Sequence, residues 1–262
     1  MMTVKYLKAD FYRMFRAPNF YIAAVSIFVI YLISTLQNFG GTNVAEMFWV
    51  VKFYSLIICI FAGSSFAFAN SLLEDEEHRF CYAAVLRGNC KAYVRAKVIC
   101  CFVGAMLAVM AGTLLYAVLL RTWLPFYGLE DDAMTKLIRE HDIFGSCIKD
   151  GGFVVYFLAS GLVLGLLGGI LSLVSMWLSL IAKNKMFAVC FPVIAYYFIV
   201  NYSADLLGQD AIWLNFNGIY LYSSYVFDDK PFFSFLYAVL LAVILSIGLG
   251  QLIYRRVCRI WR

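Results

Sequence analysis

Six long stretches of the chain contain no Asp, Glu, Lys or Arg, and the shortest of them is 19 residues long. A helix needs about 20 apolar residues to cross the hydrocarbon core of a bilayer. The strands of a membrane β-barrel would instead alternate apolar and polar positions over about ten residues, which these stretches do not. The sequence therefore predicts an all-α integral membrane protein with six transmembrane helices, at about residues 19–37, 48–70, 98–120, 153–181, 186–204 and 232–254.

Residues 1–17 show a different pattern. Apolar side chains recur at helical spacing, and the Lys and Arg residues of this segment lie on the flanks and back of the same helix. We expect an interfacial helix whose apolar stripe lies in the acyl boundary and whose cations lie among lipid headgroups. Pro18 would end this helix before the first span. Packing of the helix on the protein itself is the alternative.

The basic residues are unevenly divided along the chain. Of the 21 Lys and Arg residues, fifteen fall in the amino terminus, in residues 71–97, in the link at 183–185 and in the carboxyl tail. Because basic loops stay in the cytoplasm, we expect both termini and the 71–97 segment to be cytoplasmic. Residues 121–150 and 205–231 then form extracellular segments. The net charge of +5 reports membrane orientation, so no nucleic-acid partner is expected.

Composition agrees with the helical pattern. Hydrophobic residues make up 64% of the chain and charged residues 14%, whereas a soluble domain carries about a quarter charged residues. We therefore expect residues 1–262 to form a single transmembrane domain in a lipid bilayer.

Small residues mark two of the predicted spans. Gly161, Gly165 and Gly169 recur every fourth position, and Gly104 and Gly112, with Ala108 between them, repeat this spacing in an earlier span. Such stripes let two helices approach closely. The pattern fits packing within one chain or between two chains.

An aromatic stretch, AIWLNFNGIYLYSSYVF, lies in the 205–231 segment and is interrupted by Asn and Gly. One interpretation is a re-entrant segment, since irregular backbone at membrane depth needs protein or a water-filled cavity around it. The other is an aromatic belt at headgroup level. The side chains concerned are Trp213, Phe216, Tyr220 and Tyr222.

Sequence motifs for an energy source or for catalysis are lacking. The chain has no GxxxxGK[ST] loop, no HExxH pair and no GxSxG. Its two histidines, His78 and His141, are expected on opposite sides of the membrane, so they cannot share a metal. We expect no catalytic residue and no metal or other cofactor in this chain.

The 71–97 segment is a polar island between two spans. Asp75 and Arg79 have the spacing of a helical ion pair. Tyr82, Val85 and Leu86 share one side of the same helix, and a short amphipathic helix could present that side to a groove on a partner. A solvated loop that only holds topology is the alternative.

Three passages together resemble the type-2 ABC exporter permeases. They are the interfacial helix with its basic-aromatic ending (FYRMFRAPNFYIA), the charged link EDEEHRFCYAAVLRGNCKAYVRAK, and SLVSMWLSLIAKNKMFAVCFPVIAYY. The resemblance covers nearly the whole chain. The Gly-Thr pair that usually follows the glutamate of such links is replaced here by Arg79 and Phe80.

This resemblance implies a half-sized transporter. Two six-span permease subunits, identical or homologous, would rest on two separate ATPase subunits that bind ATP and Mg. Residues 1–17 would be the elbow helix and residues 71–97 the segment that couples to the ATPase. The implied contact residues are Glu74, Glu76, Glu77 and Lys91, beside Tyr82, Val85 and Leu86; Lys97 would match a second basic position.

The function expected on this basis is a multi-pass permease in a bacterial cell membrane. It would export an amphipathic or hydrophobic substrate, such as an antimicrobial peptide, a lipid or a drug, and so could confer antimicrobial peptide resistance. The alternative is a non-transport sensor or scaffold whose outer loops bind a ligand.

Overall fold

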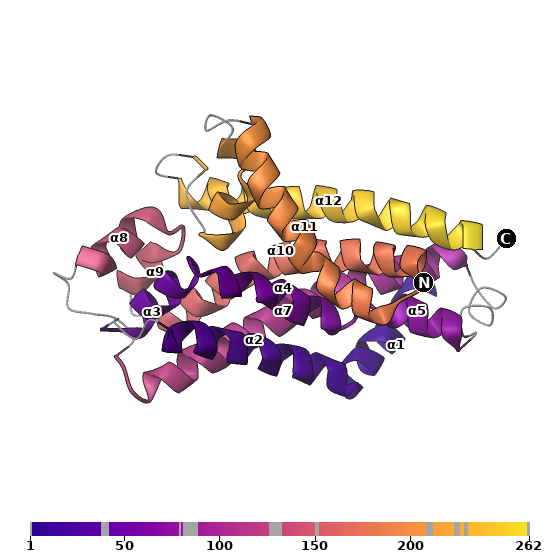
Figure 1. Cartoon of the computed structure of the whole chain (residues 1–262), viewed down its shortest axis with the longest axis horizontal. Coiled ribbons are helices and arrows are strands. Elements are labelled where there is room, and N and C mark those ends of the chain that lie inside the picture. The colour runs from indigo at the N-terminus through magenta and orange to yellow at the C-terminus, as the bar shows by residue number, and fades with distance from the viewer. Residues whose placement is uncertain are drawn as a thin grey trace.

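The computed structural model describes residues 2–37, 42–78, 80, 89–125, 133–149, 152–207, 212–222, 226–227 and 230–260. These residues form helices joined by turns, without a β-strand among them. Figure 1 shows an elongated bundle with α1, α5 and both termini at one end and α3, α8 and α9 at the other. The elements are α1 (Met2–Arg16), α2 (Pro18–Leu36), α3 (Val44–Val51), η1 (Ser55–Ile58), α4 (Cys59–Phe66), α5 (Ser71–Glu77), α7 (Cys90–Arg121), α8 (Ala133–His141), α9 (Gly145–Lys149), α10 (Phe153–Ala182), α11 (Lys185–Leu207), η2 (Ile212–Leu214), η3 (Asn217–Leu221) and α12 (Pro231–Ile260).

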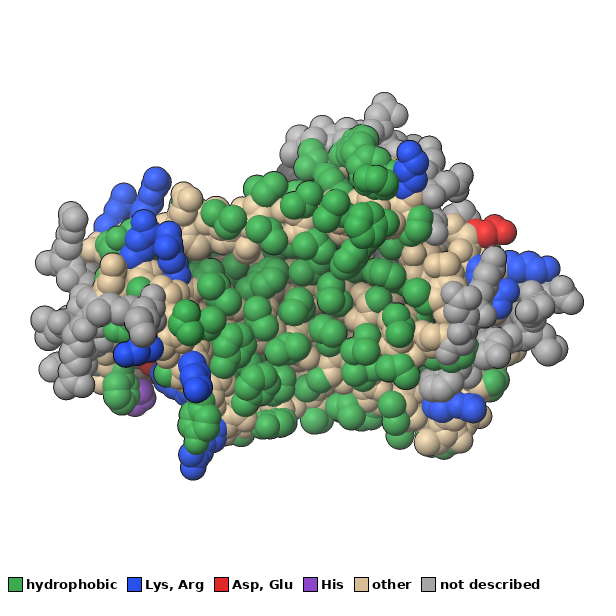
Figure 2. All heavy atoms as spheres, turned by 180° about the vertical axis from the view of Figure 1, so that it is seen from behind, with side chains coloured by type: hydrophobic (Ala, Val, Ile, Leu, Met, Phe, Trp, Pro, Cys, Tyr) green, Lys and Arg blue, Asp and Glu red, His purple; other side chains and the backbone are tan. Residues whose placement is uncertain are grey.

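Four of the described helices, α2, α7, α10 and α12, are long and apolar enough to cross a membrane. Figure 2 shows a broad apolar surface across the middle of the molecule, with Lys and Arg side chains toward its two ends. A bilayer demands this distribution, because its core accepts apolar side chains and its headgroups accept cations. The prediction of an all-helical membrane protein is confirmed at this level.

Two predicted spans take other forms. In the second, α3 meets the η1–α4 helix at an angle of 86°. α3 stops at Lys52, where the backbone N–H groups of Lys52, Phe53 and Tyr54 turn back to carbonyls three residues earlier. In the fifth, α11 (Lys185–Leu207) carries Pro192 in its interior, where a proline lacks the backbone N–H that would continue the helical hydrogen bonding.

The core is centred on α10, in whose most apolar stretch 78% of the residues are buried. The glycine stripe of α10 faces α7: Gly161 lies against Thr113, Gly165 against Met106 and Gly169 against Phe102. These glycines bring the two helix backbones close together, so more apolar atoms touch than larger residues would allow. On the other faces of α7, Gly104 lies against Met14 of α1 and Gly112 against Ile27 of α2. All five glycines therefore pack against helices of their own chain.

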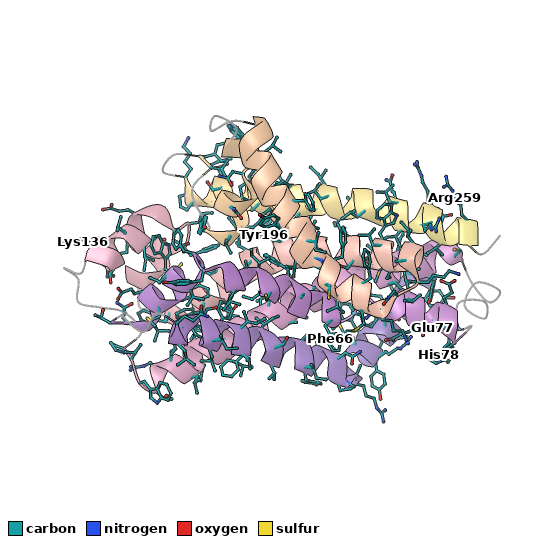
Figure 3. The ribbon with its side chains drawn as sticks, viewed as in Figure 1. Phe66, Glu77, His78, Lys136, Tyr196 and Arg259 are labelled. Carbon is teal, nitrogen blue, oxygen red and sulfur yellow. The ribbon has the colours of Figure 1, made fainter. Side chains whose placement is uncertain are left out.

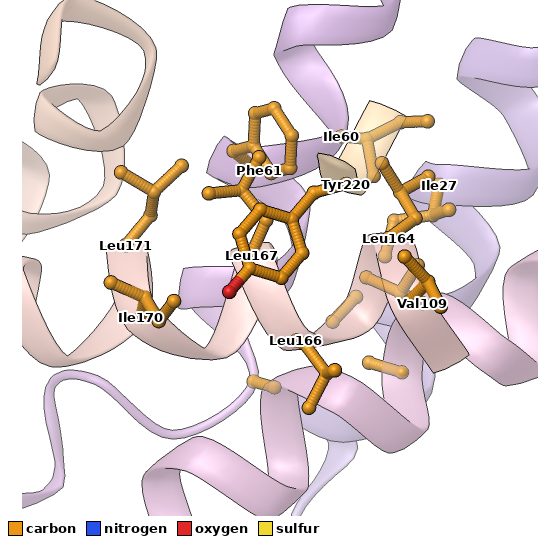
Figure 4. Close-up of a cluster of buried hydrophobic side chains, with 14 of the residues drawn as sticks. Ile27, Ile60, Phe61, Val109, Leu164, Leu166, Leu167, Ile170, Leu171 and Tyr220 are labelled. Carbon is orange, nitrogen blue, oxygen red and sulfur yellow. The ribbon is translucent and has the colours of Figure 1, made fainter. Parts of the chain in front are cut away.

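The aromatic segment is divided between the core and the surface. Tyr220 is fully buried, and Figure 4 shows it among the core side chains near Phe61 and Leu167. Its hydroxyl donates a hydrogen bond to the carbonyl oxygen of Ala238 on α12. Trp213 stays 49% exposed and packs against Tyr237. Tyr222 stacks on Phe53 beside the α3–α4 bend, and Phe216 stacks on Tyr220.

The α7–α10 contact gives a first prediction. A Cβ at position 165 would lie 3.0 Å from the carbonyl oxygen and 3.1 Å from the Cα of Met106, both backbone atoms. Gly165→Ala should therefore lower the free energy of unfolding by about 1–3 kcal/mol. Thermal or SDS-induced unfolding in detergent measures this change. Gly248→Ala is the control, since nothing lies within 4 Å of a Cβ at that position; an equal loss there would contradict the packing argument.

Candidate functional site: the acidic helix and its ion pairs

Helix α5 is a short acidic helix, SLLEDEE, between the apolar α4 and α7. Its Leu72 and Leu73 are buried and fix the helix on the bundle, which leaves the four acids to be distributed around it. Figure 3 shows Glu77 and His78 at the end of the molecule where α12 carries Arg259. The other labelled charged residue, Lys136, lies at the opposite end.

Asp75 points inward to a cluster that joins three helices. The ammonium of Lys97 on α7 lies 2.9 Å from Oδ1 of Asp10 on α1 and 2.8 Å from Oδ2 of Asp75. Arg13 of α1 donates a hydrogen bond of 2.5 Å to Oδ1 of Asp75, and the hydroxyl of Tyr93 donates to Oδ2. We call Asp10, Arg13, Asp75, Tyr93 and Lys97 the Lys97 cluster.

The Lys97 cluster is neutral in sum, with two carboxylates facing two cations. The Lys97 side chain is fully buried, and its ammonium also lies 5.1 Å from the centre of the Phe68 ring. Buried charges are costly unless they are paired and hydrogen-bonded. Removing one of the four charged members would leave the opposite charge in excess, so the cluster holds α1, α5 and α7 in one arrangement.

The two carboxylates of the cluster respond differently to their surroundings. Burial raises the pKa of Asp10, and the attraction of Lys97 only partly offsets it. Burial also acts to raise the pKa of Asp75, but Lys97, Tyr93 and Arg13 together outweigh it and hold the pKa below its usual value. Asp75 is thus the anion that the cluster is built to stabilise.

The outer acids of α5 reach the turn between α10 and α11. Oε1 of Glu76 lies 3.6 Å from the ammonium of Lys183, and Oε2 of Glu77 lies 2.5 Å from that of Lys185. Lys183 has a left-handed backbone (φ 51°) that ends α10, and the side chain of Asn184 accepts hydrogen bonds from the first N–H groups of α11. The turn is therefore shaped to present two cations to α5.

The structure separates the residues proposed to couple to a partner. Glu74 lies 3.8 Å from Arg13, beside the Lys97 cluster, and Glu76 and Glu77 face the α10–α11 turn. Lys91 is exposed on the first turn of α7, where its backbone N–H is capped by the side chain of Asn89. Tyr82, Val85 and Leu86 lie outside the described residues.

A second buried ion pair closes the opposite end. The ammonium of Lys52, at the α3–α4 bend, lies 3.7 Å from Oδ2 of Asp142 and 4.7 Å from the centre of the Phe48 ring. The hydroxyl of Tyr156 and the backbone N–H of Phe144 both donate to Asp142. Burial raises the pKa of Asp142. This pair fastens the bend to the α8–α9 region and to the start of α10.

No family model, curated protein or solved structure matches this chain. Within the described ranges, no group of three or more His, Cys, Asp or Glu residues is arranged to hold a metal ion. The geometry of the ion pairs therefore carries the argument about function.

Sequence reasoning missed Asp10, Tyr93 and the burial of Lys97. A signal for them exists in helical spacing. Asp10 is the only acid in α1 and lies three residues before Arg13, while Tyr93 and Lys97 are four apart on α7. Each pair shares one helix face, so a lone acid opposite a Tyr-Lys pair could have indicated a contact between the two helices.

Removal of the central cation should unfold the amino-terminal end of the bundle. Lys97→Met leaves two buried carboxylates facing each other with only Arg13 to compensate, so we expect a loss of about 3–5 kcal/mol in unfolding free energy. Detergent-phase unfolding measures it. Lys8→Met, which removes an exposed cation from α1, is the control and should change stability little. The double variant Lys97→Met with Asp10→Asn should recover part of the loss, and no recovery would contradict the assigned pairing.

The opposite pKa shifts of the two carboxylates predict a pH effect. The folded-state pKa of Asp75 is lowered, so its stabilisation is present above the unfolded value of about 3.9 and is lost as pH falls through the folded value. The folded-state pKa of Asp10 is raised, so ionisation of Asp10 at neutral pH lowers the free energy of unfolding. Asp75→Asn should therefore cost more at pH 7 than Asp10→Asn. Unfolding curves from pH 7 to pH 3 should show a smaller acid loss for Asp75→Asn than for the wild type.

Proposed function

We propose that this chain is the membrane-spanning permease subunit of an ATP-binding cassette exporter of the type-2 kind. The proposal places both termini and α5 in the cytoplasm of a bacterial cell, with α1 as the elbow helix. It pairs the chain with a second permease subunit, identical or homologous, and with two ATPase subunits that bind ATP and Mg.

The observation that carries the proposal is the position of α5 among its ion pairs. Through Asp75 this helix is joined to α1 and α7, and through Glu76 and Glu77 to the turn between α10 and α11. A partner that pushes on α5 would therefore act on four helices at once. The sequence carries no nucleotide-binding loop of its own, so such a push would come from another chain.

The six spans of the proposal assign the bent α3–α4 pair as a broken second span and α11 as the fifth. Broken helices are tolerated at membrane depth where neighbouring helices satisfy their backbone groups. Here α4 packs between α2, α10 and α11. This arrangement supports the assignment of the second span.

Among the acids of α5, Glu77 is the best contact for an ATPase. Its side chain is 45% exposed, against 32% for Glu74 and 17% for Glu76, while Asp75 is buried. The Glu77–Lys185 pair is half in solvent, where a salt bridge contributes little. A basic residue on a partner could therefore replace Lys185 at low cost.

The proposed substrate is amphipathic or hydrophobic, such as a peptide, a lipid or a drug. This follows from the resemblance and from a core whose largest buried side chains are mostly aromatic and aliphatic. Between the two buried ion pairs at the ends, the described spans contribute hydroxyl groups such as those of Thr113 and Ser172 and no buried charge.

Co-purification tests the proposal. The tagged wild-type chain should capture an ATP-hydrolysing subunit from the cells that express it, and failure to capture one would refute the proposal. Glu77→Lys and Leu86→Asp should each lower the captured ATPase about tenfold or uncouple its ATP hydrolysis from transport, while the chain still inserts in the membrane. A loss of about 1.4 kcal/mol corresponds to this factor.

A charge exchange separates two roles of Glu77. The double variant Glu77→Lys with Lys185→Glu restores the pair inside the chain but leaves the wrong charge toward a partner. We expect capture to stay low in the double variant. Full recovery would mean that Glu77 acts through α11, and the assignment of Glu77 as the ATPase contact would be wrong.

A further inference from the structure

A groove lies between α7 and α12 at the end of the bundle that carries both termini. Its cavity volume is about 790 Å³, within the ~300–1,000 Å³ typical of small-molecule sites. One wall is formed by α7 and the other by α12, with Thr3 of α1 at one edge. The floor is made by Val94 and Val98, which are buried, and by Gly250, whose missing side chain leaves the space open.

The groove changes from cationic to apolar along its length. On α7 its lining runs Lys91, Arg95 and Ile99 at four-residue steps, and on α12 it runs Arg255, Gln251 and Ile247. Four residues of helix rise about 6 Å, so each wall passes from a cation to an isoleucine over about 12 Å. Both walls have their cations at the same end, because the two helices are antiparallel there.

The three cations of the groove have no acidic partner within the described ranges. The acids at this end of the bundle are engaged elsewhere: Asp10 and Asp75 with Lys97, Glu74 with Arg13, Glu76 with Lys183 and Glu77 with Lys185. The charge of Lys91, Arg95 and Arg255 is therefore available to an external anion.

At its apolar end the groove opens onto the surface that faces hydrocarbon. Ile99 is 43% exposed and Ile247 57% exposed, and Ile247 continues into the exposed apolar face of α12 at Ile244 and Leu240. A ligand in the groove would thus meet cations at headgroup depth and apolar side chains at acyl depth.

We propose that this groove binds one anionic phospholipid of the leaflet at the termini, with its phosphate among Lys91, Arg95 and Arg255 and an acyl chain along Val98, Ile99 and Ile247. Basic pockets between membrane helices suit anionic headgroups. A water-soluble phosphate would use the cations but not the apolar walls, and a zwitterionic lipid would bring a cation of its own to the cationic end of the groove. The site stands apart from the exporter proposal, so failure to capture an ATPase leaves it intact.

Lipid titration of the full-length chain, followed by native mass spectrometry, tests the site. The probes are phosphatidylglycerol, phosphatidylcholine with the same acyl chains, and glycerol phosphate. The wild type should prefer phosphatidylglycerol over phosphatidylcholine at least about tenfold, since both headgroups carry a phosphate but only phosphatidylglycerol is a net anion, and each basic residue adds about a fewfold in affinity for an anionic headgroup. Glycerol phosphate should not displace the bound lipid.

Two pairs of variants separate the charge of the groove from its shape. The preference for phosphatidylglycerol should be lost in the groove triple variant, which combines Lys91→Gln, Arg95→Gln and Arg255→Gln. It should stay within about twofold of the wild type in a control triple variant, which combines Lys5→Gln, Lys8→Gln and Arg259→Gln, because these three residues lie outside the groove. Gly250→Leu should weaken lipid binding about fivefold, because the leucine side chain would fill the space proposed for the acyl chain. Gly248→Leu, whose side chain meets open space, should not.

Three results would overturn the proposal. They are equal affinity of the wild type for the two lipids, an equal loss of preference in the control triple variant, and displacement of the lipid by glycerol phosphate. The size-exclusion profile of each variant shows whether the chain is folded. If the groove triple variant does not fold, the lipid affinities of Gly250→Leu and Gly248→Leu are compared instead, and equal affinities would overturn the proposal.

Discussion

The ammonium of Lys97 is the contact on which the amino-terminal end of the bundle depends. It lies between Asp10 and Asp75, and no water can replace these two carboxylates because the Lys97 side chain is fully buried. The cost of exposing three charges to a low-dielectric interior fixes the position of α1. That helix buries Asp10 and Met14 against α7 and leaves Val4, Tyr12 and Phe15 exposed. It thus packs on the protein with one face and leaves apolar side chains exposed on the other.

A buried lysine–aspartate pair stabilises each end of the bundle, whereas close helix packing stabilises the middle. Lys97 at one end and Lys52 at the other each form a buried pair with an aspartate beneath an aromatic ring. Between them, glycines let α10 lie directly against α7, and hydroxyl groups bond to backbone carbonyls of their own helices or, as between Thr35 and Tyr116, from one helix to the next. Charge therefore fixes which segments meet, and shape fixes how closely they approach.

The hydrophobic pattern predicted the class of fold because the thickness of a bilayer sets a minimum length for each spanning helix. Helices α2, α7, α10 and α12 are each long and apolar enough to meet this requirement. The pattern did not predict the bend at Lys52, since apolar residues on both sides of a single lysine carry no signal of a change in direction. It also treated Lys97 as a marker of topology at the surface. A charge count cannot tell a solvated lysine from one that reaches Asp10 across two helices, because the partner lies 87 residues away in the chain. The acids of α5 were found by their density, but only the fold shows that Asp75 turns inward and Glu77 outward.

The left-handed backbone of Lys183 limits which residues the turn between α10 and α11 accepts at this position. A left-handed residue other than glycine costs about 1–2 kcal/mol, and glycine is the usual residue where a helix ends in this way. Here the position keeps a side chain that reaches Glu76. In this chain a charged side chain therefore stands where the backbone favours glycine. A glycine at 183 in a related chain would fit the turn more easily, and it would mark a molecule in which α5 is no longer tied to the end of α10.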